Sequence, residues 1–159
     1  MTHADVAIIG SGFAGLGMAI RLKQAGLDDF VVLERGEDVG GTWWFNSYPG
    51  CQCDIPSHLY SFSFALNPEW SRTYSKQEEI QRYLRDCAER YGVTRHIRLD
   101  TNVDDAEWDD DAQRWRLQTT GGEVVARVLV AGFGPLSEPS VPDLPGLDTF
   151  RGTTFHTAA

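Results

Sequence analysis

The sequence predicts an α/β fold in which a parallel sheet alternates with helices. Residues 5–10, DVAIIG, form a short apolar run of the kind found in parallel strands buried on both faces. A glycine-rich turn follows, and apolar residues then recur at helical spacing from Phe13 to Ala25. A second apolar run, FVVLE at residues 30–34, completes a strand, helix and strand unit. Such a unit implies a right-handed crossover between parallel strands.

Composition restricts the function classes. The 159 residues fit one domain, and 42% hydrophobic residues can form a core. A net charge of −9 repels phosphate backbones and anionic lipids, so we expect neither a nucleic-acid nor a membrane partner. The start, MTHADVAIIG, lacks the features of a secretion signal, which predicts a cytoplasmic protein. The three cysteines, Cys51, Cys53 and Cys87, are expected to be reduced packing residues.

The middle of the chain combines a long loop with one clear helix. Residues 40–70 are rich in aromatics, Gly, Pro and Ser, which predicts a structured loop with one short helix at most. Ser75 and Glu78 have the spacing of a capping box, and Gly92 can end the helix that follows. The apolar residues of one face of that helix are Ile80, Leu84, Cys87 and Tyr91.

The last third of the chain reads as strands followed by a linker. Residues 97–108, 114–120 and 123–132 predict a small antiparallel β insertion, whose final part, VLVAG, returns to the parallel sheet. Four prolines in PLSEPSVPDLPG, residues 135–146, predict a rigid extended linker. The acidic stretch DDAEWDDD lacks the glycine and terminal glutamate of a calcium loop, so no metal site is expected.

Gly10, Gly12 and Gly15 form a GxGxxG motif between the first predicted strand and the first helix. In this context the first glycine allows a tight turn, the second lets the backbone approach a pyrophosphate, and the third lets helix and strand pack closely. Glu34, at the end of the second strand, can accept hydrogen bonds from both ribose hydroxyls of an adenosine and would repel a 2'-phosphate. The motif therefore predicts a Rossmann-type domain that binds FAD or NAD.

A second motif narrows this choice by resemblance. Residues 40–54, GGTWWFNSYPGCQCD, resemble the GGxWxxxxYPGxxxD signature of Baeyer-Villiger monooxygenases, flavoenzymes that use NADPH and dioxygen. The similarity continues through PSHLYSFSF, WSRTYSKQEEIQRYL and GFGPLSEPSVPDLPG. It implies the FAD-binding portion of an enzyme that converts a ketone to an ester or lactone through a flavin peroxide. The alternatives are a heteroatom-oxidising flavin monooxygenase and a non-catalytic or degenerate FAD-binding module.

The resemblance also implies roles for individual residues. Thr42 and Trp43 would line the flavin, and Asp54 would be a catalytic residue between flavin and nicotinamide, holding an arginine that lies beyond residue 159. The other expected cofactor-binding residues are Tyr60, Val103 and Gly132 for FAD, with Gln52 and Cys53 near the nicotinamide. NADP(H) binding is implied by the resemblance alone.

The last ten residues, FRGTTFHTAA, resemble a family fingerprint, FxGxxxHxxxW, through Phe150, Gly152 and His156. We therefore expect an incomplete FAD-binding domain over residues 1–145 and the start of a linker to an NADPH-binding domain over 146–159. Such a chain would act only with the rest of its own polypeptide, on a small ketone or heteroatom substrate and dioxygen.

Overall fold

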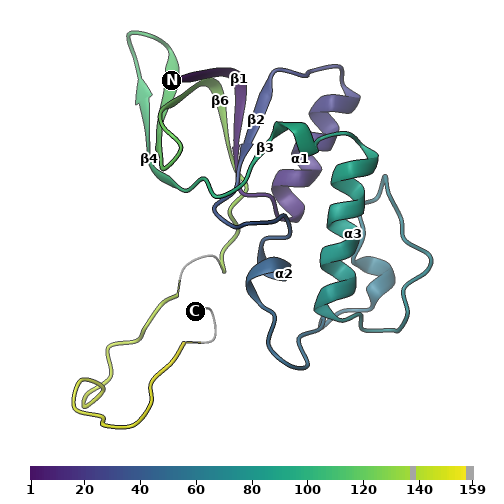
Figure 1. The fold of residues 1–159 in the computed structure, drawn as a ribbon, viewed down its shortest axis with the longest axis vertical. Coiled ribbons are helices and arrows are strands. Elements are labelled where there is room, and N and C mark those ends of the chain that lie inside the picture. The colour runs from purple at the N-terminus through teal and green to yellow at the C-terminus, as the bar shows by residue number, and fades with distance from the viewer. Residues whose placement is uncertain (137–138, 157–159) are drawn as a thin grey trace.

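The computed structural model describes residues 1–136 and 139–156, and six strands of this part of the chain form one sheet (Figure 1). The strands are β1 (Thr2–Ile9), β2 (Phe30–Leu33), β3 (Ile97–Arg98), β4 (Val103–Asp109), β5 (Arg114–Thr119) and β6 (Val124–Ala131). Their order in the sheet is β3-β2-β1-β6-β5-β4. β1 pairs in parallel with both β2 and β6, and β2 with β3, whereas β5 pairs antiparallel with β4 and β6. The predicted α/β class with a parallel sheet is confirmed.

Of the three helices, the two longer ones cover one face of the sheet. The helices are α1 (Phe13–Gln24), α2 (Thr42–Phe45) and α3 (Gln77–Arg90), with 3₁₀ turns at Ser57–Leu59 and Thr94–His96. Leu16 and Ile20 of α1, together with Ile80 and Leu84 of α3, share a buried cluster with Ile8 of β1. Fully burying one such side chain contributes about 1.5–3 kcal/mol. α1 and α3 are therefore fixed against the parallel strands by their apolar faces.

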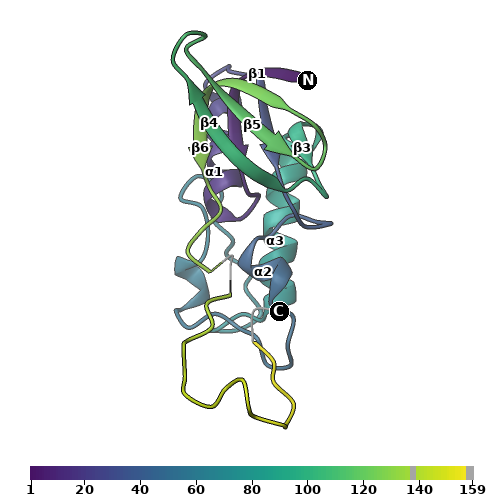
Figure 2. The same ribbon diagram turned by 90° about the vertical axis from the view of Figure 1, so that its left-hand side faces the viewer.

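The antiparallel strands cover part of the opposite face, and the predicted antiparallel insertion that leads back to the parallel sheet is confirmed. Strands β4 and β5 continue the edge of the same sheet and curl across it (Figure 2). Leu117 of β5 and Val124 of β6 share a second buried cluster with Ala7 and Leu33 of the parallel strands. The right-handed twist of the sheet thus brings the strands at its antiparallel edge over the parallel strands.

The strand predicted over residues 97–108 is in fact two strands. Ile97–Arg98 pairs in parallel with β2, and β4 begins only at Val103. Between them Asp100 has a φ of 51°, a left-handed conformation that aspartate tolerates better than most residues. This turn sends the chain from one edge of the sheet to the other.

The predicted capping box is wrong. α3 begins at Gln77 after Lys76, which makes no side-chain cap, and Glu78 is exposed. The backbone N–H of Ser75 donates to Ser57 Oγ at 2.8 Å, and the two hydroxyl oxygens lie 2.9 Å apart. Ser75 is thus turned inward to hold the long loop against the start of α3, so its hydroxyl does not cap the helix.

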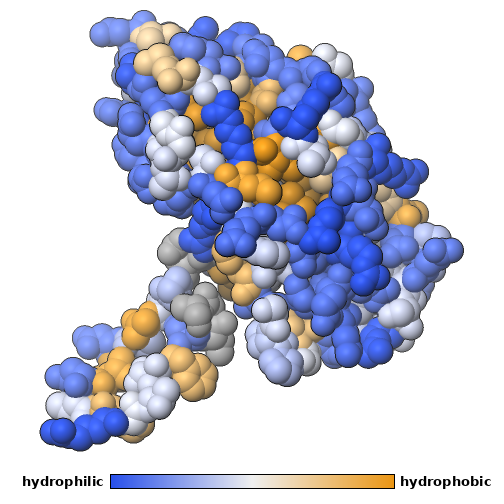
Figure 3. Space-filling view, in the orientation of Figure 1, coloured by the Kyte–Doolittle hydropathy of each residue, from blue (hydrophilic) through white to orange (hydrophobic). Residues whose placement is uncertain are grey.

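Beyond β6 the described residues contain neither helix nor strand and form an arm that extends away from the body (Figures 1 and 2). Apolar side chains lie on the surface of the arm, among them Val141, Leu144 and Phe150 (Figure 3). Residues 137–138 of the predicted linker and 157–159 of the predicted second segment lie outside the described residues. No helix in the described part of the chain has the length and apolar character needed to cross a membrane.

Candidate functional site

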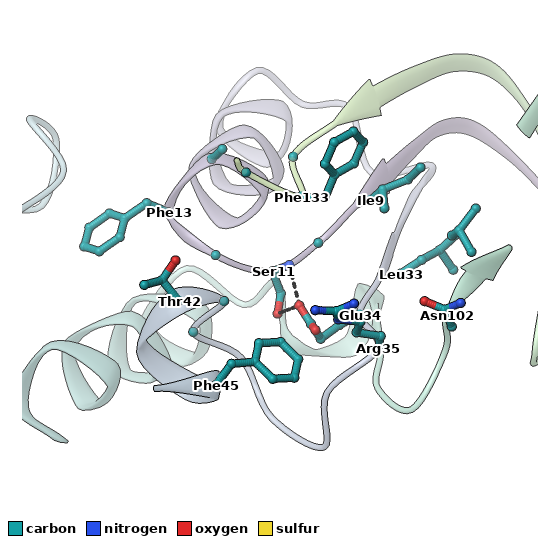
Figure 4. Close-up of a pocket in the computed structure, with 18 of the residues that line it drawn as sticks. Ile9, Ser11, Phe13, Leu33, Glu34, Arg35, Thr42, Phe45, Asn102 and Phe133 are labelled. Atoms are coloured by element: carbon teal, nitrogen blue, oxygen red, sulfur yellow. Dashed lines mark hydrogen bonds between the residues drawn. The ribbon is translucent and has the colours of Figure 1, made fainter. Parts of the chain in front are cut away.

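A cavity of about 620 Å³ lies at the carboxyl ends of β1, β2 and β6, where α1 begins (Figure 4). Most of its lining comes from residues 9–14, 33–35, 40–43, 101–106 and 132–134. The volume is within the ordinary range of small-molecule and cofactor sites, and the carboxyl end of a parallel sheet is where such sites form.

Gly10 and Gly15 are fixed by packing. Gly10 has a φ of +90°, and a Cβ added there would lie 2.9 Å from the carbonyl oxygen of Gly132. A Cβ added at Gly15 would lie 1.8 Å from the carbonyl oxygen of Gly10. The helix and the end of β1 can approach each other this closely only because neither residue has a side chain.

Gly12 differs from the other two glycines of the motif. A Cβ added there would meet nothing closer than Gly41 Cα at 3.6 Å, which is an ordinary contact. Packing of the chain itself therefore does not require glycine at this position. The side chain is missing beside the cavity, where a bound group would need the space.

The N-terminus of α1 begins at this glycine. Gly12 is the N-cap of α1 and, among the described residues, no side chain caps the helix there. The first backbone N–H groups and the positive end of the helix dipole favour an anion at such a terminus. Gly12 and the uncapped helix end together fit the pyrophosphate of a dinucleotide.

Glu34 lies at the end of β2 and is only 3% exposed. Its Oε2 accepts hydrogen bonds from the backbone N–H and the hydroxyl of Ser11, both at 2.7 Å, and its Oε1 accepts one from the N–H of Gly36 at 2.8 Å (Figure 4). A carboxylate offers about four acceptor positions. Three are taken by the protein itself, and the remaining acceptor capacity is available to a bound ribose.

An aromatic wall closes one side of the cavity. Trp43 is 7% exposed, and its Nε1 donates a hydrogen bond to Tyr60 Oη at 3.2 Å. The Tyr60 ring packs edge-on against Trp43 and Phe13, with ring centroids 5.3 and 5.1 Å away. Burial, and more weakly the nearby Cys53 and Asp54, raise the pKa of the Tyr60 phenol, although the Trp43 hydrogen bond opposes this. Tyr60 is therefore neutral at physiological pH.

Several lining residues were not predicted, notably Ser11, Phe13, Arg35, Phe45 and Phe133. Arg35 directly follows Glu34, and its guanidinium lies 4.8 Å from the centre of the Phe45 ring. The sequence could have indicated Ser11 and Arg35 as lining residues, because each is the immediate neighbour of a predicted binding residue.

Of the predicted site residues, the structure brings Gly10, Gly12, Glu34, Thr42, Trp43, Tyr60, Val103 and Gly132 together around the cavity. Gly15 packs beneath it. Gln52, Cys53 and Asp54 do not line the cavity.

The segment from Gln52 to Asp54 runs along the start of α3. Gln52 forms an isolated β-bridge with Lys76, and Cys53 is 2% exposed with its Sγ 3.9 Å from Ser57 Oγ. Asp54 is exposed. The structure therefore holds this segment by its backbone and leaves the carboxylate of Asp54 at the surface.

The fingerprint residues Phe150, Gly152 and His156 lie on the arm and do not line the cavity. A Cβ at Gly152 would lie 2.4 Å from the exposed ring of Phe150. Within residues 1–136 and 139–156, no three His, Cys, Asp or Glu side chains are grouped to hold a metal ion.

Comparison with known proteins identifies the family. The model of the pyridine nucleotide-disulphide oxidoreductases matches residues 7–158. The chain belongs to this family. It is 58% identical over 156 residues to a Baeyer-Villiger monooxygenase of Streptomyces coelicolor and 49% identical to one of Pseudomonas aeruginosa. Each alignment covers 98% of this chain, which spans about 30% of the length of these relatives.

Solved structures give the same result. A closed structure of cyclohexanone monooxygenase superposes with a TM-score of 0.87 at 38% identity, covering 100% of this chain and 31% of that one. A steroid monooxygenase bound to NADP superposes with a TM-score of 0.82 at 43% identity, covering 99% and 31%. The resemblance to Baeyer-Villiger monooxygenases is thus confirmed over nearly the whole chain.

Proposed function

We propose that this chain binds FAD in the cavity and forms the flavin-binding portion of an NADPH- and dioxygen-dependent monooxygenase of the Baeyer-Villiger type. The observation that carries the proposal is the space beside Gly12 at the uncapped N-terminus of α1, which packing within the chain does not explain. Its relatives include Baeyer-Villiger monooxygenases and an FAD-binding monooxygenase of Aspergillus niger.

The residues of the chain divide the work of holding FAD. The N–H groups at the start of α1 would receive the pyrophosphate, and Glu34 would accept a hydrogen bond from the adenosine ribose. Thr42, Trp43, Tyr60, Val103 and Gly132 are proposed to contact the remainder of the cofactor. The buried Trp43 and the partly buried Tyr60 would keep water away from that wall of the cavity.

Bound FAD would supply electron transfer from NADPH and activation of dioxygen for insertion of oxygen beside a ketone carbonyl. Asp54 is proposed as a catalytic residue toward the nicotinamide side, with Gln52 and Cys53 nearby. Two observations support this role: Asp54 is exposed, and its charge is close to Tyr60. As part of a longer polypeptide, residues 1–145 would be the FAD-binding domain and 146–159 the start of the connection to an NADPH-binding domain.

The test is the flavin content of the purified chain. We expect FAD in near-equal amount with protein, identified by chromatography after release. The Gly12→Ala variant should fold and lose FAD, because the added methyl occupies the space beside the helix end. Gly121→Ala is the matched control, since its added methyl also meets nothing closer than 3.6 Å and lies in the hairpin before β6. Folded wild-type protein that cannot take up FAD would contradict the proposal.

A further inference from the structure

The turn formed by residues 38–43 contributes residues 40–43 to the lining of the cavity. Gly40 and Gly41 have φ values of +136° and +55°, and glycine backbones lose the most conformational freedom on folding. A Cβ at Gly41 would lie 2.9 Å from Gly12 Cα, so this turn sits directly against the glycine loop. The backbone N–H of Gly40 donates to the Ser11 carbonyl at 3.1 Å, so one hydrogen bond links the turn to the glycine loop, and further contacts with the turn come from α3.

Three polar side chains of α3 contact this turn from behind. Gln77, Gln81 and Arg85 are four residues apart and share one face of the helix. We call these three residues the polar ladder. It lies beside the apolar face that anchors α3 in the core.

Each member of the ladder contacts a different part of the turn. Gln77 Nε2 donates to the backbone carbonyl of Trp43. Gln81 Nε2 lies 3.5 Å from both Asp38 Oδ2 and the carbonyl oxygen of Val39. The guanidinium of Arg85 forms an ion pair with Asp38. The ladder thus contacts both ends of the turn.

The middle of the turn is contacted as well. A Cβ added at Gly40 would lie 3.2 Å from Gln81 Cγ, and Gln77 Nε2 donates to Gln81 Oε1 at 3.3 Å, which links the first two members. Gln77 is only 6% exposed. A buried amide needs hydrogen-bond partners, whereas an apolar side chain at the same position would not. The anchoring of α3 by Ile80 and Leu84 does not explain a buried amide there. Its contact with the Trp43 carbonyl does.

We propose that the polar ladder is a positioning element for the cofactor: it fixes the turn 38–43 against the glycine loop and thereby sets the affinity for FAD. The claim about affinity for FAD rests on the proposed function. Gln77 and Gln81 are positioning residues, since they act through the turn and line no part of the cavity.

The test replaces Gln77 by methionine, which keeps the length and helix preference of the side chain but removes the donor. Two controls accompany Gln77→Met. Glu78→Met makes a similar change at an exposed position in the first turn of helix α3. Val93→Ala removes buried volume beyond the end of α3, far from the ladder's contacts. Val93→Ala separates loss of positioning from general loss of stability.

Two quantities are measured. In the FAD-free chain, hydrogen exchange is followed at the amides of Trp43, Trp44 and Phe45, whose N–H groups donate to Gly40 and Gly41 carbonyls. We expect Gln77→Met to speed their exchange about tenfold, the change expected from losing one hydrogen bond. The Kd for FAD should rise about tenfold as well. Both controls should change exchange at these amides and Kd less than about twofold.

The outcomes separate the two proposals. Unchanged exchange in Gln77→Met, or an equal increase in Val93→Ala, would overturn the ladder as a positioning element. Faster exchange with an unchanged Kd would overturn its link to affinity. A wild-type chain that binds no FAD would contradict the proposed function, while the exchange measurement would still decide whether the ladder orders the turn.

Discussion

The cavity and the segment from Gln52 to Asp54 carry two halves of the same sequence signature, but their structures differ. Around the cavity, Gly10 and Gly15 are fixed by close backbone packing, Glu34 accepts hydrogen bonds from Ser11, and Trp43 donates one to Tyr60. Asp54 lies at the surface, outside the cavity, and its segment is held by backbone bonds near the start of α3 and by the buried side chain of Cys53. The cavity proposed to hold the nucleotide is thus built from ordered parts of the fold, whereas Asp54 lies outside it.

The largest expected effect separates two glycines of one motif. Gly15→Ala should destabilise the fold by about 3 kcal/mol or more, because backbone atoms cannot move away from a methyl group placed 1.8 Å from a carbonyl oxygen. Gly12→Ala should change the free energy of unfolding by about 1 kcal/mol or less. Urea unfolding of both variants checks this difference, and equal losses would remove the distinction between packing and binding glycines.

The next effect concerns the buried carboxylate. Glu34→Ala leaves the N–H and hydroxyl of Ser11 and the N–H of Gly36 without their acceptor, which should cost about 3 kcal/mol in free energy of unfolding. Glu37→Ala removes an exposed carboxylate three residues away and should change it by no more than about 0.5 kcal/mol. If the two variants unfold at the same urea concentration, Glu34 does not hold the glycine loop.

A smaller effect is expected at the aromatic wall. Tyr60→Phe removes the acceptor of Trp43 Nε1 and should lower the free energy of unfolding by about 1 kcal/mol, whereas Tyr74→Phe at an exposed ring should not. Because burial raises the pKa of Tyr60, its stabilising contribution should be full below pH 10.0 and decline above it. The free energy of unfolding, measured below and above that pH, tests the direction of this pH dependence. The same alkaline decline in a Tyr60→Phe variant would contradict its assignment to Tyr60.

The smallest effect is expected outside the cavity. Asp54→Asn should leave the free energy of unfolding within about 0.5 kcal/mol and the Kd for FAD within about twofold of wild type, because the side chain is exposed and does not line the cavity. Fluorescence titration with FAD checks the second value. A large loss of affinity would show that Asp54 contributes to the flavin site directly, and the cavity and the Asp54 segment would then act as one site.

The sequence predicted best where backbone geometry restricts residue type. The β1-α1-β2 unit, Gly10, Gly15 and the end of β2 were all placed correctly, because close packing and buried strands leave a clear pattern. The capping box failed because the Ser75 hydroxyl meets Ser57, eighteen residues away along the chain. The break between β3 and β4 was missed because a single left-handed residue, Asp100, leaves no periodicity to detect.

The site was predicted less completely than the fold. Gly10 and Gly12 of the glycine motif and Thr42 and Trp43 of the resembled signature line the cavity as predicted, whereas Gln52, Cys53 and Asp54 do not. Ser11, Arg35 and the polar ladder were not predicted. Their roles depend on which segments the fold brings together, such as α3 behind the turn 38–43, and no local spacing encodes that proximity. The hydrogen bonds that Ser11 and Gly36 donate to Glu34 likewise depend on the fold.

The arm that follows β6 has a consequence for handling the protein. Its described residues lie outside any helix or strand, and Arg151 is exposed on it. Proteases bind substrates in extended form, so brief exposure to trypsin should cut after Arg151 well before it cuts within the sheet. Loss of Gly152 and the residues after it would then be visible by mass spectrometry as a single early product, and the cavity in the trimmed protein should keep its capacity for FAD.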